Sequence, residues 1–180
     1  MPSELLIRTP RLELIAATLD LIAAELAGPA ALGALLGVPV PADWPPGEYD
    51  RDALEFFTAL LVSGGPAAVG WYNWYALALG ADGRRTALVG GAGYLGPPAH
   101  GGVEIGYSVL PQARGHRFAT EMVEALTVRA LSLDAVHRVI AHTLDANTPS
   151  QAVLRRCGFL PVEAGTAPGL IRFERVRSGP

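Results

Sequence analysis

The sequence predicts an α+β fold in which a single mixed sheet is flanked by helices. Two observations support this class. Two strand-like runs, residues 71–79 and 86–95, are joined by a short turn and predict an antiparallel pair. Further on, a strand, a helix and a second strand follow one another over residues 103–144. That order implies a parallel pair joined by a right-handed crossover, so the sheet holds both orientations.

The N-terminal third is predicted to contain one interrupted strand and three helices. The strand covers residues 5–15 and the helices cover residues 18–26, 30–37 and 52–62. Pro10 cannot donate to a strand ladder, so the strand is expected at an edge or with a bent start. Thr18 is the expected N-cap of the first helix.

Residues 38–52 predict an irregular loop, because they contain four prolines and a glycine. The loop is also acidic, and two interpretations are open. It is a solvated surface loop, which the usual polarity of loops favours. Alternatively, it is a lid whose negative field attracts a cationic amine and whose Trp44 covers that amine.

Residues 103–121 carry the clearest combination of signals. Apolar residues alternate with other residues from Val103 to Val109, which is the period-two pattern of a strand with two different faces. Pro111 ends this strand, and residues 112–117 form a basic, glycine-containing turn. From Phe118 onward the apolar residues recur at helical spacing. A basic turn therefore opens a helix.

Such a turn can bind a phosphate group. The first N–H groups of a helix lack partners within it, and the helix dipole favours an anion there. Arg114, His116 and Arg117 would add positive charge. The alternative is an ordinary strand-to-helix connection whose arginines are only solvated.

The C-terminal part is predicted to complete the sheet. Residues 136–144 form a strand, residues 147–156 a short helix, and two last strands begin at Phe159 and Leu170. For the helix we predict Thr148 as the N-cap, with Gln151 completing a capping box.

Composition limits the function. A length of 180 residues, half of them hydrophobic and 17% charged, predicts one folded domain over residues 1–180. No apolar run predicts a membrane span or a signal peptide, so we expect a cytoplasmic protein without a membrane partner. Basic residues cluster only locally, so we expect no nucleic-acid partner. The single cysteine, Cys157, has apolar neighbours and is predicted to be buried and inert.

Several catalytic chemistries are not supported. All fourteen basic residues are arginine, so there is neither a lysine nucleophile nor a lysine-containing phosphate loop. The four histidines lack metal-ligand spacing, and we expect no metal. Glu104, mid-strand among apolar residues, is either a solvent-facing residue or a general base in a cleft, where desolvation would raise its pKa. Ser150 and Asn147 are either helix-start residues or ligand contacts.

Three segments carry a resemblance to a known family. They read TPRLEL, VEIGYSVLPQARGHRFATE and HTLDANTPSQAVLRRCGF. Together they resemble the GNAT superfamily of acyl-CoA N-acyltransferases, and most of all its branch of Rim-type ribosomal-protein N-terminal acetyltransferases. The resemblance implies a central sheet of six to seven strands, splayed between the two parallel strands where the pantetheine of acetyl-CoA inserts.

The resemblance also implies roles for individual residues. The backbone of Val109 and Leu110 would bind pantetheine, and Glu104 would be the general base. The pyrophosphate would be held by N–H groups of Arg114, Gly115, His116, Arg117, Phe118, Ala119 and Thr120.

Two positions depart from the family pattern. Arg117 stands where glycine is usual, so it either strains the turn or adds a phosphate contact. Leu154 stands where many relatives have a tyrosine that protonates the thiolate, and Ser150 is the expected substitute, as an acid or only to orient the sulfur.

The resulting hypothesis is an acetyl-CoA-dependent N-acetyltransferase. Its acceptor would be a small-molecule or peptide amine, and the protein would be a monomer or homodimer. The rival hypothesis is a non-catalytic acyl-CoA-binding or regulatory module.

Overall fold

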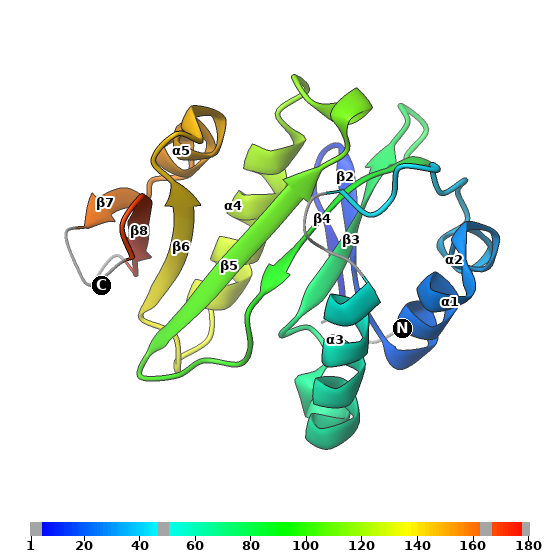
Figure 1. The fold of residues 1–180 in the computed structure, drawn as a ribbon. Helices are drawn as coiled ribbons and strands as arrows, with labels where there is room; N and C mark the ends of the chain where they lie inside the picture. The colour runs from blue at the N-terminus through cyan, green and yellow to red at the C-terminus, as the bar shows by residue number, and fades with distance from the viewer. Residues whose placement is uncertain (1–4, 47–50, 163–166, 178–180) are drawn as a thin grey trace.

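A computed structural model describes residues 5–46, 51–162 and 167–177 (Figure 1). The α-helices are α1 (Leu19–Ala27), α2 (Pro29–Leu36), α3 (Arg51–Gly64), α4 (Phe118–Leu131) and α5 (Thr148–Arg156). The strands are β1 (Leu6–Arg8), β2 (Leu12–Ala16), β3 (Asn73–Leu79), β4 (Arg85–Tyr94), β5 (Gly102–Val109), β6 (Arg138–Leu144), β7 (Leu160–Val162) and β8 (Leu170–Val176). Two short 3₁₀ helices are η2 (Gly65–Ala68) and η3 (Pro111–Ala113).

The mixed sheet is confirmed. Its eight described strands lie in the order β1-β2-β3-β4-β5-β6-β8-β7, and β5 and β6 form the parallel pair. This is more than the six to seven strands expected, because residues 5–15 form two strands rather than one interrupted strand. The chain turns back at Thr9, whose N–H donates to the carbonyl of Leu12, and Leu6 then pairs with Ile15.

Helices cover both faces of the sheet, and each face has its own hydrophobic core. On one face, Met122, Val123 and Leu126 of α4 pack against side chains of the sheet. On the other face, α1, α2 and α3 enclose the core that contains Ile22 and Leu77. Successive residues of a strand point to opposite faces, so alternate residues of β5 face either α4 or the layer of α1, α2 and α3.

β5 and β6 diverge along their length (Figure 1). Their parallel register runs over three pairs and ends at Glu104 with Ile140. On its other side β5 stays paired with β4 as far as Val109. The strands therefore part between the second half of β5 and the second half of β6, as the resemblance implied.

The start of α5 corrects one prediction. The N-cap is Asn147, whose side-chain oxygen accepts from the N–H of Ser150 at 3.1 Å, and Thr148 is the first helical residue. There is no capping box, because the Gln151 amide donates to the carbonyl of Asp145 instead. In the described ranges, no helix has the length and apolar character needed to cross a membrane.

Candidate active site

The first turn of α4 is open to an anion. Its N-cap is Arg117, which makes no side-chain capping bond, and the first intrahelical bond runs from the N–H of Glu121 to the carbonyl of Arg117. By contrast, Thr18 caps α1 with its side chain, as predicted. The N–H groups of Phe118, Ala119 and Thr120 precede the first intrahelical bond, so they are the groups a bound phosphate would meet.

The turn before α4 has a left-handed backbone at two positions. Gly115 has φ 81° and Arg117 has φ 63°. Glycine adopts this conformation without a steric penalty, whereas a residue with a Cβ does not. Arg117 therefore strains the turn. Its side chain is exposed, and so are those of Arg114 and His116.

Replacing Arg117 with glycine is expected to raise the free energy of unfolding by about 1 kcal/mol, because the left-handed conformation then carries no steric cost. Arg117→Ala is the matched control, since it removes the same charge but keeps a Cβ. Denaturant unfolding of both variants measures the difference. Equal stability of the glycine and alanine variants would rule out backbone strain at this position.

An arginine from the other end of the chain holds this turn. Arg11 donates from Nη1 to the carbonyl of His116 at 3.0 Å, and its guanidinium lies 5.3 Å from the centre of the Phe118 ring. Two more Arg11 nitrogens donate to one carboxylate oxygen of Glu121, at 2.9 and 2.6 Å. The hydroxyl of Thr9 donates to the other oxygen at 2.6 Å. We call these contacts the Arg11 clasp.

The clasp determines the ionisation of Glu121. Burial alone would raise the pKa of this carboxyl group. The hydrogen bonds from Thr9 and from the backbone and side chain of Arg11, with the Arg11 charge, outweigh burial and hold the pKa below its ordinary value. The carboxylate is therefore charged and paired at neutral pH.

The end of β5 separates the two residues expected to bind pantetheine. The N–H of Leu110 donates to the carbonyl of Val89 and its carbonyl accepts from Ala113, so both backbone groups of Leu110 are engaged. The carbonyl of Val109 accepts from Nε of Arg114 at 3.2 Å. The backbone groups of Leu110 are therefore held by main-chain partners, whereas the Val109 carbonyl is held by the exposed side chain of Arg114.

Glu104 lies on the face of β5 opposite α4, together with Gly106 and Ser108, as the alternation predicted. Its Oε1 is 2.8 Å from Nδ1 of His142 on β6, and the two side chains are 32% and 29% exposed. His142 was not predicted to be a site residue. The part of the chain that the structure describes contains no group of three or more His, Cys, Asp or Glu side chains that could hold a metal ion.

Tyr107 is a second site residue that sequence reasoning missed. It points to the other face of β5, and its hydroxyl lies 2.8 Å from Oγ of Ser150 and donates to the Ser150 carbonyl at 3.1 Å. The contact spans the opening between β5 and α5. Burial raises the pKa of Tyr107 to about 12, so the hydroxyl keeps its proton at neutral pH.

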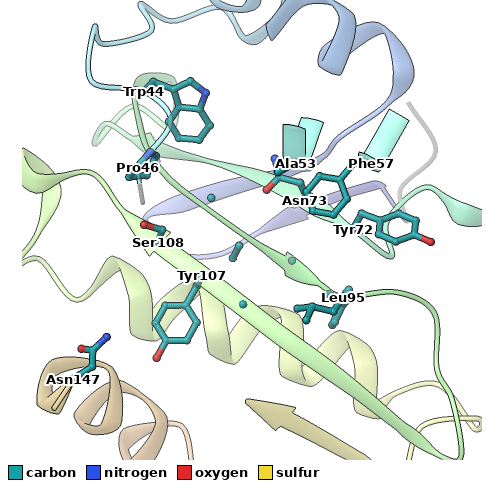
Figure 2. A pocket seen from close by; sticks show the side chains of 15 residues that line it. Trp44, Pro46, Ala53, Phe57, Tyr72, Asn73, Leu95, Tyr107, Ser108 and Asn147 are labelled. Carbon is teal, nitrogen blue, oxygen red and sulfur yellow. The ribbon is translucent and has the colours of Figure 1, made fainter. Parts of the chain in front are cut away.

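A cavity of about 690 Å³ lies against β4 and β5 next to this opening (Figure 2). Its lining includes Trp44, Phe57 and Tyr72, and it extends to Tyr107 and Asn147. Trp44 lies on the wall of this cavity, and the alternative in which it covers a cationic amine stays a prediction. Glu48 and Asp50 of the predicted acidic lid lie outside the described residues.

Two further predicted positions are part of the core. Leu154 is fully buried, so α5 presents no polar side chain at the position where many relatives have a tyrosine. Cys157 is 3% exposed, and burial raises the pKa of its thiol to about 11. A buried thiol that stays protonated is a poor nucleophile, in line with the prediction that Cys157 is inert.

Comparisons with known proteins agree with this geometry. The family profile described as acetyltransferase (GNAT) domain matches residues 7–160. The uncharacterized N-acetyltransferase YjdG of Bacillus subtilis (strain 168) is 29% identical over 126 residues, which cover 69% of this chain and 71% of YjdG. This is a relationship visible in sequence over most of the chain.

Solved structures share the fold at lower identity. A GNAT-family acetyltransferase from Bacillus anthracis superposes with a TM-score of 0.62 at 17% identity, covering 96% of this chain and 98% of that one. RimL, a ribosomal L7/L12 alpha-N-protein acetyltransferase in complex with coenzyme A, gives a TM-score of 0.60 at 19% identity, covering 95% and 97%.

Proposed function

The chain belongs to the GNAT acetyltransferase family, and from this premise we propose that it transfers the acetyl group of acetyl-CoA directly to a primary amine, with Glu104 as the general base. The observation that carries the proposal is the opening between β5 and β6. It begins where their pairing ends, at Glu104 and Ile140, and the cavity beside Trp44 extends to Tyr107 and Asn147 at this opening.

The acetyl-CoA side of the proposal uses the described geometry of the Arg114–Thr120 turn. The open N–H groups of Phe118, Ala119 and Thr120 would bind the pyrophosphate, and Gly115 leaves room for it to approach. The exposed side chains of Arg114, His116 and Arg117 would add charge. Val109 would bind pantetheine through its backbone, and Asn147 borders the same opening.

The acceptor side provides the base. An amine attacks a thioester only in its neutral form, so a proton must leave the nitrogen. Glu104 would take that proton, directly or through a water molecule, while its contact with His142 holds the carboxylate in place. The new C–N bond forms, the C–S bond breaks, and CoA departs as a thiolate that then takes up a proton. Holding both substrates in one complex supplies most of the acceleration.

Tyr107 and Ser150 are proposed to orient the thioester rather than to protonate the thiolate. The pKa of Tyr107 is about 12. A thiol has an ordinary pKa of about 8.5, so full proton transfer from the tyrosine to the thiolate is unfavourable. A hydrogen bond to the sulfur carries no such cost.

Tyr107→Phe is therefore expected to lower kcat by only about three- to tenfold, which corresponds to the loss of one hydrogen bond. Steady-state thiol release measures this change. Ser150→Ala should have a similar effect, and the double variant should be no slower than the worse single variant, because both remove the same contact. A loss of a thousandfold or more in Tyr107→Phe would instead identify it as the general acid.

Two measurements on the same preparation test the proposed function. Titration calorimetry with acetyl-CoA measures binding, and thiol release against a panel of primary amines measures transfer. We expect saturable binding and amine-dependent release. Binding without release from any amine would favour the rival non-catalytic module, and failure to bind acetyl-CoA would contradict both.

A further inference from the structure

We infer that the acceptor is a primary amine whose body is hydrophobic and uncharged, and that this body occupies the cavity between β4, β5 and α3. The inference rests on the proposed function and specifies its acceptor. It is carried by three properties of the cavity: its described lining carries no charge, Trp44 and Phe57 present ring carbon rather than polar atoms, and its floor is open.

The cavity lining contains no ionisable charge among the described residues. Its fifteen residues include no Asp, Glu, Arg, Lys or His. A second ammonium group on the acceptor, or a carboxylate, would lose its hydration here without gaining a partner. Glu104 lies just past the lining, two residues before Gly106 on the same face of β5. The Glu104 carboxylate can therefore pair with one positive charge at that end of the cavity, where we place the reacting amine.

The polar atom of the Trp44 indole is bound outside the cavity. Nε1 of Trp44 donates to a carboxylate oxygen of Glu25 at 2.5 Å, and the hydroxyl of Tyr75 donates to the other oxygen at 2.6 Å. Phe57, on the α3 side of the cavity, has no polar atom in its side chain. The rings of Trp44 and Phe57 therefore offer apolar surface to an occupant (Figure 2).

Glu25 makes Trp44 a fixed wall. Burial holds the pKa of Glu25 above its ordinary value, although the hydrogen bonds from Tyr75 and Trp44 oppose this shift. The indole also packs against Tyr75, with ring centroids 6.0 Å apart. Because the Trp44 indole is fixed by both Glu25 and Tyr75, it should select acceptors by their shape.

The floor under this wall is open. Gly106 contributes to it, and a Cβ added at this position would meet only Leu95, at 3.7 Å. A side chain introduced there would extend into the cavity without striking the backbone. With about 690 Å³ available, the cavity has the size of a small-molecule site or of a pocket for one peptide residue.

Acceptor selection by the unmodified protein tests the inference. Thiol release is measured with 2-phenylethylamine, isoamylamine and an amidated peptide that begins with phenylalanine. The charged arms are spermidine, kanamycin and glutamate. Burial of a phenyl-sized body predicts kcat/KM about 10- to 100-fold higher for the hydrophobic amines. Comparing the peptide with the two free amines shows whether the hydrophobic acceptor is a peptide N-terminus or a small-molecule amine.

Two adjacent phenylalanines of α3 provide a matched pair. Phe57 lines the cavity, whereas Phe56 is 61% exposed and does not. Phe57→Glu should lower kcat/KM for 2-phenylethylamine at least tenfold, and Phe56→Glu should not. Gly106→Val is the independent variant, since it narrows the cavity without adding charge and should penalise large amines more than ethylamine. For each variant, calorimetry with acetyl-CoA checks that the fold is intact.

The outcomes separate the inference from the function it rests on. Preference for spermidine, kanamycin or glutamate would overturn the hydrophobic class and leave acetyl transfer standing. Equal losses in Phe56→Glu and Phe57→Glu would also overturn it. Acetyl-CoA binding with no turnover of any amine would overturn both the class and the proposed transfer.

Discussion

Replacing Glu104 with glutamine is expected to lower the rate of acetyl transfer at neutral pH by about 10²- to 10⁴-fold, the usual contribution of a general base. Glutamine has nearly the same shape, and its amide can still hydrogen-bond the His142 ring, which lies 2.8 Å from the Glu104 carboxylate. The substitution therefore removes proton acceptance while it preserves packing. Steady-state thiol release with a saturating amine measures the loss.

Acetyl-CoA affinity is the internal control for Glu104→Gln. The variant should bind acetyl-CoA as the unmodified protein does, because the proposed pyrophosphate site at the start of α4 lies beyond the far end of β5. Glu55→Gln, on the exposed surface of α3, is the matched carboxylate control and should retain its rate. A Glu104→Gln enzyme of unchanged rate would remove Glu104 from the mechanism.

Replacing Arg11 with alanine is expected to weaken acetyl-CoA binding by about ten- to a hundredfold, since hydrogen bonds to a charged group contribute about 1.5–3 kcal/mol. The variant loses the bond to the His116 carbonyl, which holds a turn containing one strained residue. It also leaves Glu121 unpaired in the first turns of α4, where its negative charge opposes bound phosphate. Calorimetric titration with acetyl-CoA measures the change.

Two further variants separate these causes. Arg8→Ala is the matched control, because Arg8 is a nearby exposed arginine that contacts Gly83 and Glu13 instead of the turn. The double variant Arg11→Ala/Glu121→Gln has no unpaired charge at position 121, but it still lacks the Arg11 clasp. Recovery of affinity in the double variant would assign the effect to charge. Unchanged affinity in Arg11→Ala would contradict a role for the clasp in binding.

The clasp also predicts a pH dependence. The pKa of Glu121 is lower in the folded protein than in the unfolded chain. Its stabilising contribution is therefore complete above the unfolded value of about 4.3 and is lost as the pH falls through the folded value. Acid unfolding of Glu121→Gln should lack this component of the transition.

Features written in consecutive residues could be predicted from the sequence. The alternation along β5 placed Glu104 and Gly106 on one face, and the helical spacing from Phe118 placed the start of α4 correctly. The sequence shows that arginine stands at position 117 where the family pattern has glycine, although only the structure gives its φ of 63°. Local periodicity is sufficient for these features because each depends on neighbouring residues.

Contacts between distant segments could not be predicted in the same way. Glu104 and His142 are 38 residues apart, and Arg11 and Glu121 are 110 residues apart. Each contact depends on strand register or on how a turn packs against a helix, which alternation does not encode. Tyr107 was missed for the same reason, since it meets Ser150 only because α5 lies beside the parted strands.

The parting of β5 and β6 also bears on how the protein behaves in solution. A gap inside a sheet creates two additional strand edges, here the second halves of β5 and β6. Exposed edges can pair with strands of other chains and so promote aggregation. A substrate lying along the gap would cover both edges. Saturating acetyl-CoA should therefore protect concentrated protein from self-association.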